Sequence, residues 1–205
     1  MNNNMILNPH TPTPLDPYMH LSPHFTLGEM TRSGTATKLG IDNTPTAEDI
    51  DRMRLLCRRT LEPIRRQMGR LMVNSGYRSE LLNKAVGGAR NSQHTRGEAA
   101  DLYCKDLDTA QRMMVLLSYG YIPFDQFIIE QKLYYGVCWV HVSYRGKRYG
   151  LENRGEIINE RGHLTRPMAE WLHECRLRWA WQAQHEATEP QAFAESSHIS
   201  SPYAS

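Results

Sequence analysis

The segment that most constrains the fold runs from Ser92 to Tyr103 and reads SQHTRGEAADLY. It places His94 and Asp101 on either side of Gly97, which permits a tight turn between them. The run EAADLYCK predicts a strand, and side chains alternate between the two faces of a strand. Asp101 then shares one face with Ala99 and Tyr103, and the other face carries Ala100, Leu102 and Cys104. We therefore expect His94 and Asp101 to meet at one surface of a sheet.

A third candidate donor, His141, lies in the later strand-like run WVHVSY. Nine histidines in 205 residues make chance spacings common, so the His94 and Asp101 pair alone is weak evidence. Two imidazoles and one carboxylate, however, form a three-ligand zinc set that leaves the fourth tetrahedral position open for water. Water in an open position ionises near neutral pH. The sequence therefore predicts one Zn²⁺ ion, held by His94, Asp101 and His141, in a hydrolase.

Five ordered motifs carry a family resemblance. They are SGYRS at 75–79, LNKAVGG at 82–88, SQHTRGEAAD at 92–101, FDQFIIE at 124–130 and WVHVSYR at 139–145. Together they resemble the zinc D-Ala-D-Ala carboxypeptidase family, in particular its small phage and prophage members that cleave cell-wall peptides. The resemblance runs from about Phe25 to Arg145. It implies an α+β fold shared with the hedgehog signalling domain, in which a small antiparallel sheet carries the zinc and helices pack on one side.

Arg78 follows a predicted strand, LMVNS, and precedes Ser79, which can cap a short helix. The resemblance puts a substrate-binding arginine at this position. A fixed guanidinium can stabilise the oxyanion that develops during attack on an amide, or can bind a substrate carboxylate. We expect this role for Arg78, with a surface ion pair as the alternative.

The general base is the part of the predicted site that departs from the usual pattern of the family. Family members usually carry an acid or histidine two or three residues before the last ligand, where this chain has Cys138 and Trp139. The nearest upstream acid is Glu130, which shares a face with Trp139 and His141 only if it pairs with Trp139. We predict that register, with Glu130 as the base. Asp125 and then Glu98 are the alternatives.

The predicted mechanism is hydrolytic. Zinc binds water, Glu130 removes its proton, the hydroxide attacks a peptide carbonyl, and Glu130 returns the proton to the leaving amine. Ser92 is a candidate for binding substrate or for capping a turn. Trp139 is a candidate for the pocket floor or for simple edge packing.

Three functions remain open at this point. D-Ala-D-Ala carboxypeptidase activity is the default, and it needs a second cation for the substrate carboxylate, for which Arg78, Arg90 and Arg96 are candidates. A peptidoglycan endopeptidase needs an open groove instead. The missing acid before His141 would also suit a non-catalytic, zinc-stabilised module that binds the cell wall or belongs to a virion.

Composition is that of an ordinary globular protein, with 40% hydrophobic and 22% charged residues. A formal charge of +2 does not by itself imply nucleic acid, and a weakly basic surface would suit an anionic cell wall. We expect no nucleic-acid partner and no stable membrane insertion. The N-terminus lacks the features of a secretory signal. We expect synthesis in the cytoplasm and action on the wall after release, by a holin, by lysis or within a virion.

Four segments are predicted along the chain: a flexible N-terminal arm over 1–24, a zinc peptidase domain over 25–150, a loop and C-terminal helix over 151–184, and a disordered tail over 185–205. Inside the domain, Thr46 should cap a helix that Pro63 kinks or splits. A second helix should run from Asp108 or Thr109 to Tyr119. The four cysteines show no CxxC spacing, which favours buried thiols over disulfides.

Overall fold

The computed structural model describes residues 15–119, 122–146, 154–159, 162–167, 173–174 and 176. None of the helices in this part of the chain has the length and apolar character needed to cross a bilayer. The helices are α1 (Leu27–Thr31), α2 (Gly34–Leu39), α3 (Ala47–Leu56), α4 (Glu62–Met68), α5 (Glu80–Ala85) and α6 (Leu107–Tyr119). The strands are β1 (His20–Ser22), β2 (Phe25–Thr26), β3 (Val73–Ser75), β4 (Ala99–Cys104), β5 (Gln126–Lys132), β6 (Val137–Ser143), β7 (Arg154–Asn159) and β8 (Gly162–Pro167).

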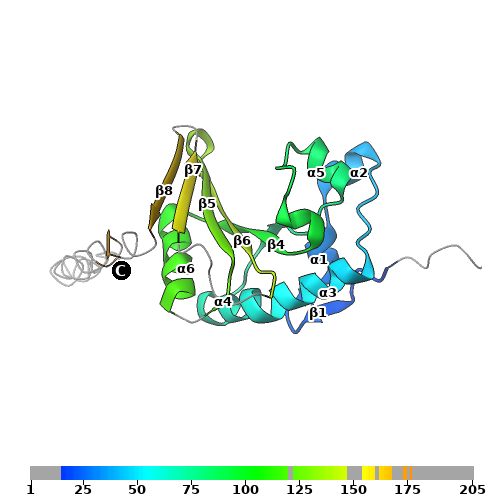
Figure 1. Ribbon diagram of the computed structural model, residues 1–205, viewed down its shortest axis with the longest axis horizontal. Coiled ribbons are helices and arrows are strands. Elements are labelled where there is room, and N and C mark those ends of the chain that lie inside the picture. The colour runs from blue at the N-terminus through cyan, green and yellow to red at the C-terminus, as the bar shows by residue number, and fades with distance from the viewer. Residues whose placement is uncertain are drawn as a thin grey trace, which may run out of the picture.

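A six-stranded sheet in the order β3-β4-β6-β5-β7-β8 forms the centre of the fold. Neighbouring strands are antiparallel except for β5 and β7, which run parallel. In Figure 1, α6 stands against the strands on one side of the molecule, α3 and α4 run beneath, and α2 and α5 rise on the opposite side. The α+β class is confirmed, with one parallel pair added to the expected antiparallel sheet.

The hydrophobic core lies on one face of this sheet. Alternation along β4 sends Ala100, Leu102 and Cys104 into the core, as predicted. The pairing of β5 with β6 adds Phe127 opposite Val142 and Ile129 opposite Val140, all fully buried. The helices α3, α4 and α6 supply the other side of the core. The opposite face of the sheet is thereby left for the polar side chains of the site.

The long helical segment beneath the sheet begins as predicted at Thr46. Its hydroxyl accepts a hydrogen bond from the Asp49 amide, and the Asp49 carboxylate accepts one from the Thr46 amide, which is a capping box. The segment does not break at Pro63. Instead a π-helical turn, Cys57–Leu61, precedes α4, and Pro63 sits in the first turn of α4. The first turn of a helix tolerates proline because its N–H groups have no partner within the helix.

The N-terminal prediction needs correction for residues 15–24. This part of the expected flexible arm is ordered, because β1 pairs with β2 and Leu21 is completely buried in the core. Glu62 on α4 fixes it further by accepting hydrogen bonds from Ser22 and His24. Residues 1–14 lie outside the described part of the chain.

The C-terminal prediction also needs correction. The segment 151–184, where a loop and a helix were expected, instead contains β7 and β8, two strands of the central sheet. The parallel pairing with β5 explains the difference, because β5 would otherwise present an unpaired edge to solvent. Helical residues follow at 173–174 and 176. The rest of the expected helix and the expected tail over 185–205 lie outside the described residues.

Candidate metal centre and active-site cleft

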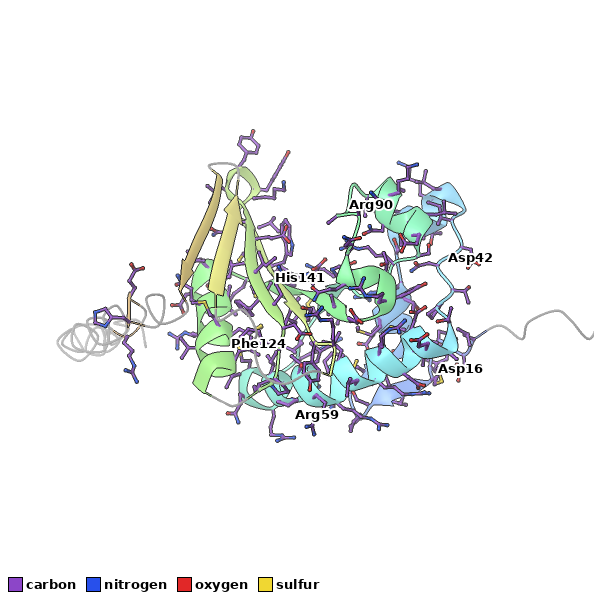
Figure 2. The ribbon with its side chains drawn as sticks, in the orientation of Figure 1. Asp16, Asp42, Arg59, Arg90, Phe124 and His141 are labelled. Carbon is purple, nitrogen blue, oxygen red and sulfur yellow. The ribbon has the colours of Figure 1, made fainter. Side chains whose placement is uncertain are left out.

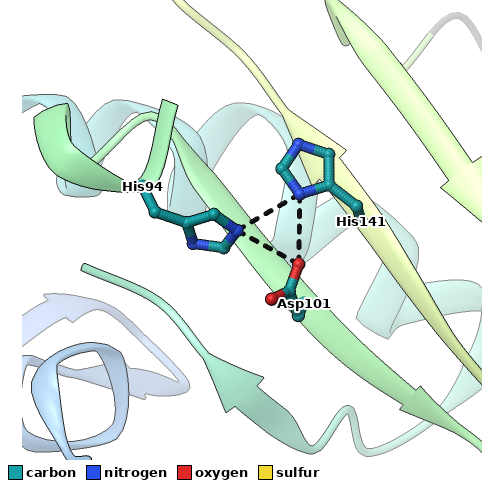
Figure 3. Close-up of side chains that lie close together, drawn as sticks. All are labelled: His94, Asp101 and His141. Atoms are coloured by element: carbon teal, nitrogen blue, oxygen red, sulfur yellow. Dashed lines mark hydrogen bonds and ion pairs between the residues drawn. The ribbon is translucent and has the colours of Figure 1, made fainter. Parts of the chain in front are cut away.

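His94, Asp101 and His141 come together on the polar face of the sheet. Asp101 on β4 is the direct cross-strand neighbour of His141 on β6. His94 comes from a 3₁₀ turn, Gln93–Arg96, that leads into β4. Figure 3 shows His94 Nε2, His141 Nδ1 and Asp101 Oδ1 pointing at one another, at 3.2 Å between the nitrogens and 3.1 Å from each nitrogen to the oxygen. The structure thus brings the three predicted ligands to a single point.

Each imidazole also has an outer nitrogen, which faces away from the other two ligands. Each outer nitrogen has a hydrogen-bond acceptor. His94 Nδ1 donates a 2.6 Å hydrogen bond to the carbonyl oxygen of Gly76. His141 Nε2 donates a 3.3 Å hydrogen bond to Oε1 of Gln93. Protonation at these outer positions leaves a lone pair on each inner nitrogen, which is the tautomer that metal binding requires.

The donor set fits a zinc ion. Two imidazole lone pairs and a carboxylate oxygen are acceptors that repel one another at close range, and a cation relieves this repulsion. Zinc bonds of about 2.0–2.2 Å in tetrahedral geometry place ligand atoms roughly 3.3–3.5 Å apart. The observed separations of 3.1–3.2 Å are close to that value. Among the described residues, this is the one group of three or more His, Cys, Asp or Glu side chains close enough to share a metal ion.

Two glycines allow the backbone to hold these ligands. Gly97 ends the 3₁₀ turn with φ +69°, and a Cβ atom there would lie 2.6 Å from the Asp49 carbonyl oxygen. Gly76 packs against Met30 so closely that a Cβ atom would collide with the Met30 carbonyl. This contact sets the position of the Gly76 carbonyl that orients His94.

Arg78 lies directly beside the metal ligands. Its Nη2 is 2.6 Å from Asp101 Oδ2, and its Nε donates a hydrogen bond to Ser75 Oγ. Burial acts to raise the pKa of Asp101. In the metal-free protein, however, an inner nitrogen of His141 or His94 that carries a proton donates to the carboxylate, and this holds the pKa of Asp101 well below its usual range. The carboxylate therefore stays ionised, as a metal ligand must be.

A cleft of about 850 Å³ opens above the three ligands. One wall comes from the segment between α5 and the 3₁₀ turn, including Gly88 and Ser92, and the other comes from β5 and β6. Figure 2 shows His141 low between these two parts of the molecule. The cations that line the cleft are Arg78, Arg96 and Arg145; Arg90 is absent from the lining residues.

The comparison with known families bears directly on this site. A family model described as peptidase M15 matches residues 23–129, which is more than half of the chain. The chain belongs to the peptidase M15 family. M15 peptidases are zinc-dependent, so the chain is a metallopeptidase with a peptide substrate. The match includes His94 and Asp101, and His141 follows it. Among curated proteins no match was found.

Glu130 lies on the cleft wall of this M15 peptidase. It pairs with Trp139 across the β5 and β6 hairpin, so the predicted register is confirmed. Both side chains line the cleft together with His141. Burial first, and then the negative charge of Asp101, raise the pKa of Glu130, whereas His141 and a hydrogen bond with Trp139 oppose the rise. A carboxylate with a raised pKa beside a metal site is suited to accept a proton.

The two alternative bases of the peptidase lie elsewhere. Asp125 accepts hydrogen bonds from the backbone N–H and Nε of Arg145, and it is absent from the residues that line the cleft. Glu98 is likewise absent from the lining and accepts a hydrogen bond from Arg96 Nε. Both carboxylates are buried and serve to hold neighbouring arginines.

Sequence reasoning missed two residues that orient the ligands, Gln93 and Gly76. Gln93 immediately precedes His94, and this adjacency is a signal that could have indicated a contact near the metal. Gly76 contributes only a backbone carbonyl, which no residue type reveals. Ser92 lines the cleft, and its hydroxyl also caps the 3₁₀ turn by accepting from the His94 amide.

Proposed function

We propose that this M15 peptidase hydrolyses peptide bonds of bacterial peptidoglycan, with release of the terminal D-alanine of D-Ala-D-Ala stems as its main reaction. The observation that carries the proposal is the convergence of His94, Asp101 and His141 at the floor of a cleft that also contains Glu130 and Arg78. A zinc site at the floor of an open cleft is suited to catalysis, because substrate and water reach the metal. The proposal places the reaction at the cell wall, after release from the cytoplasm.

A zinc ion bound by the three ligands would supply Lewis-acid chemistry, by polarising a carbonyl group and by acidifying water. Glu130 accepts the proton of the attacking water and donates it to the leaving amine. Trp139 is the cross-strand neighbour of Glu130, favours its ionised form and forms part of the pocket wall. The Arg78 guanidinium stabilises the negative charge that develops on the substrate carbonyl oxygen.

Cations in the cleft support the carboxypeptidase mode. A free substrate carboxylate needs a fixed positive partner, and arginine binds carboxylates through two parallel hydrogen bonds. Arg96 and Arg145 line the cleft, each held by one buried carboxylate through its Nε atom. We assign the substrate carboxylate to this pair, and Arg78 to the reacting carbonyl.

Endopeptidase activity is the second candidate, because a second hollow adjoins the cleft beside Arg78. A second hollow of about 560 Å³ lies between α2 and α5 and shares Asn74, Arg78 and Val86 with the main cleft. Two adjoining hollows of this kind suit a substrate that extends to both sides of the scissile bond. Cleavage within a cross-bridge is therefore the alternative reaction.

Digestion of purified peptidoglycan, analysed by mass spectrometry with and without a chelator, tests the proposal. We expect chelator-sensitive release of free D-alanine. Release of cross-linked fragments without free D-alanine would establish the endopeptidase alternative. If zinc is bound but no new amine or D-alanine appears, the chain is a non-catalytic zinc-stabilised module and the proposal is wrong.

A further inference from the structure

Exposed aromatic and aliphatic side chains gather at the turn between β5 and β6. Tyr134 and Tyr135 lie in a 3₁₀ turn at this hairpin tip and are 88% and 73% exposed. Three further exposed hydrophobic residues lie beside or below the tip: Tyr103, Leu133 and Val137. Water-exposed apolar groups that cluster in this way mark a binding surface more often than scattered ones do.

The cluster is continuous with the catalytic cleft. Tyr103, Trp139 and Glu130 are direct neighbours across β4, β6 and β5. Val137 lies two residues before Trp139 on the same strand and therefore projects from the same face. An aromatic and aliphatic strip thus leads from the metal site along the cleft wall to the two tyrosines of the tip.

We infer that this hairpin tip binds the glycan strand of peptidoglycan, with Tyr134 and Tyr135 as stacking surfaces for the hexosamine rings. The inference rests on the proposed function. A pyranose ring presents C–H groups on its faces and hydroxyl or amide groups at its edge, so it matches an aromatic ring with a polar tip. The two tyrosine rings lie edge to face, with centroids 5.0 Å apart and planes at 87°, and so present two perpendicular surfaces to a sugar.

The distance from the metal site to the tip fits the covalent structure of the substrate. His141 lies four positions after Val137 on β6, which is roughly 13 Å of strand. A stem peptide of about four residues spans at most ~13–14 Å between its glycan attachment and the terminal bond. A stem extended along the strip would therefore hold its terminal bond at the metal site and its glycan attachment beside Val137, at the base of the hairpin tip, so that the sugar rings lie next to the two tyrosines.

The test compares the wild-type chain with a Tyr134→Ala/Tyr135→Ala double variant, because both side chains are exposed and removable without a core defect. Binding of peptide-free glycan strands is measured by co-sedimentation and by calorimetry with an N-acetylglucosamine tetramer. We expect the double variant to lose about tenfold or more in affinity, the scale of two lost stacking contacts. Tyr134→Phe/Tyr135→Phe should retain binding, because the rings remain.

Tyr18→Ala is the matched control, since Tyr18 is 81% exposed and lies in the turn before β1. It should bind glycan as the wild type does. Equal glycan affinity of the wild type and the double alanine variant would overturn the inference. The inference would also be overturned, in favour of a lipid surface, by a second result. In that result no variant binds glycan, the wild type binds phospholipid vesicles, and the double alanine variant does not. Glycan binding is measured without hydrolysis, so its outcome is separate from that of the peptidoglycan digest.

Discussion

At the scale of single residues, the site depends on which imidazole nitrogen carries a proton. Gly76 and Gln93 accept hydrogen bonds from the outer nitrogens, which leaves the lone pairs of His94 Nε2 and His141 Nδ1 beside Asp101 Oδ1. The hydrogen-bond partners of metal ligands fix the tautomer and the ring orientation. We therefore expect the affinity for zinc to depend partly on residues that do not touch the metal.

Gln93→Ala should weaken zinc binding about 10–100-fold, because His141 loses the acceptor that orients its ring. Competition with a chromophoric chelator measures the affinity. Gln67→Ala, at an exposed position on α4, is the control and should bind zinc as the wild type does. Unchanged affinity in Gln93→Ala would mean that the orienting hydrogen bond is unimportant.

Glu130→Gln should retain the metal and lose about two to four orders of magnitude in hydrolysis rate, the usual contribution of a general base. Metal content and the rate of D-alanine release are measured on the same sample. Asp125→Asn and Glu98→Gln, which alter buried carboxylates outside the cleft lining, serve as comparisons. If either of these is slow while Glu130→Gln stays fast, the assignment of the base is wrong.

At the scale of elements, local rules explain where the ligands sit. Strand alternation on β4 separates Asp101 from the core residues, and cross-strand pairing brings it opposite His141. Gly97 turns the chain between His94 and this strand. These features follow from residue type and spacing, so the sequence was sufficient to predict them.

Gly97→Ala should lower the free energy of unfolding by more than about 2 kcal/mol, because alanine at φ +69° is strained and its Cβ would crowd the Asp49 carbonyl. Gly40→Ala is a matched control, with φ +63° and nothing within 4 Å of the added Cβ. It should cost only about 1–2 kcal/mol, the strain of the backbone conformation. Urea unfolding measures both, and equal losses would show that the close packing around Gly97 contributes nothing.

Glu62 links α4 to the N-terminal β1 and β2 hairpin in a pH-dependent way. Burial acts to raise its pKa, but hydrogen bonds from His24 and Ser22 outweigh it and the pKa is lowered. A lowered pKa gives stability above the unfolded value of about 4.3, and that stability is lost as pH falls through the folded value. Glu62→Gln should therefore cost about 1–3 kcal/mol at pH 7, and this cost should shrink as the pH falls below about 4 and passes through the lowered pKa of Glu62. A pH-independent cost, measured by urea unfolding, would contradict this.

At the scale of the whole molecule, the sequence predicted the site better than it predicted the chain ends. The ligands, Arg78 and the pairing of Glu130 with Trp139 follow from motifs and alternation. The order of residues 15–24 depends instead on the burial of Leu21 and on Glu62, which is distant in sequence. The pairing of β7 with β5 is also long-range, and short segments give no local signal for it. Gly76 was missed because it contributes only a backbone carbonyl, and Gln93 was missed because its contact is with His141, which is distant in sequence.

We propose that one zinc ion, held by His94, Asp101 and His141, acts as the Lewis acid in peptide hydrolysis. The most direct test is to titrate zinc into metal-free protein while amine release from purified peptidoglycan is measured. We predict that the rate rises in proportion to added zinc and levels off at about one equivalent per chain, with no recovery in His94→Ala. Full hydrolysis before zinc is added, or full activity in His94→Ala, would contradict the claim.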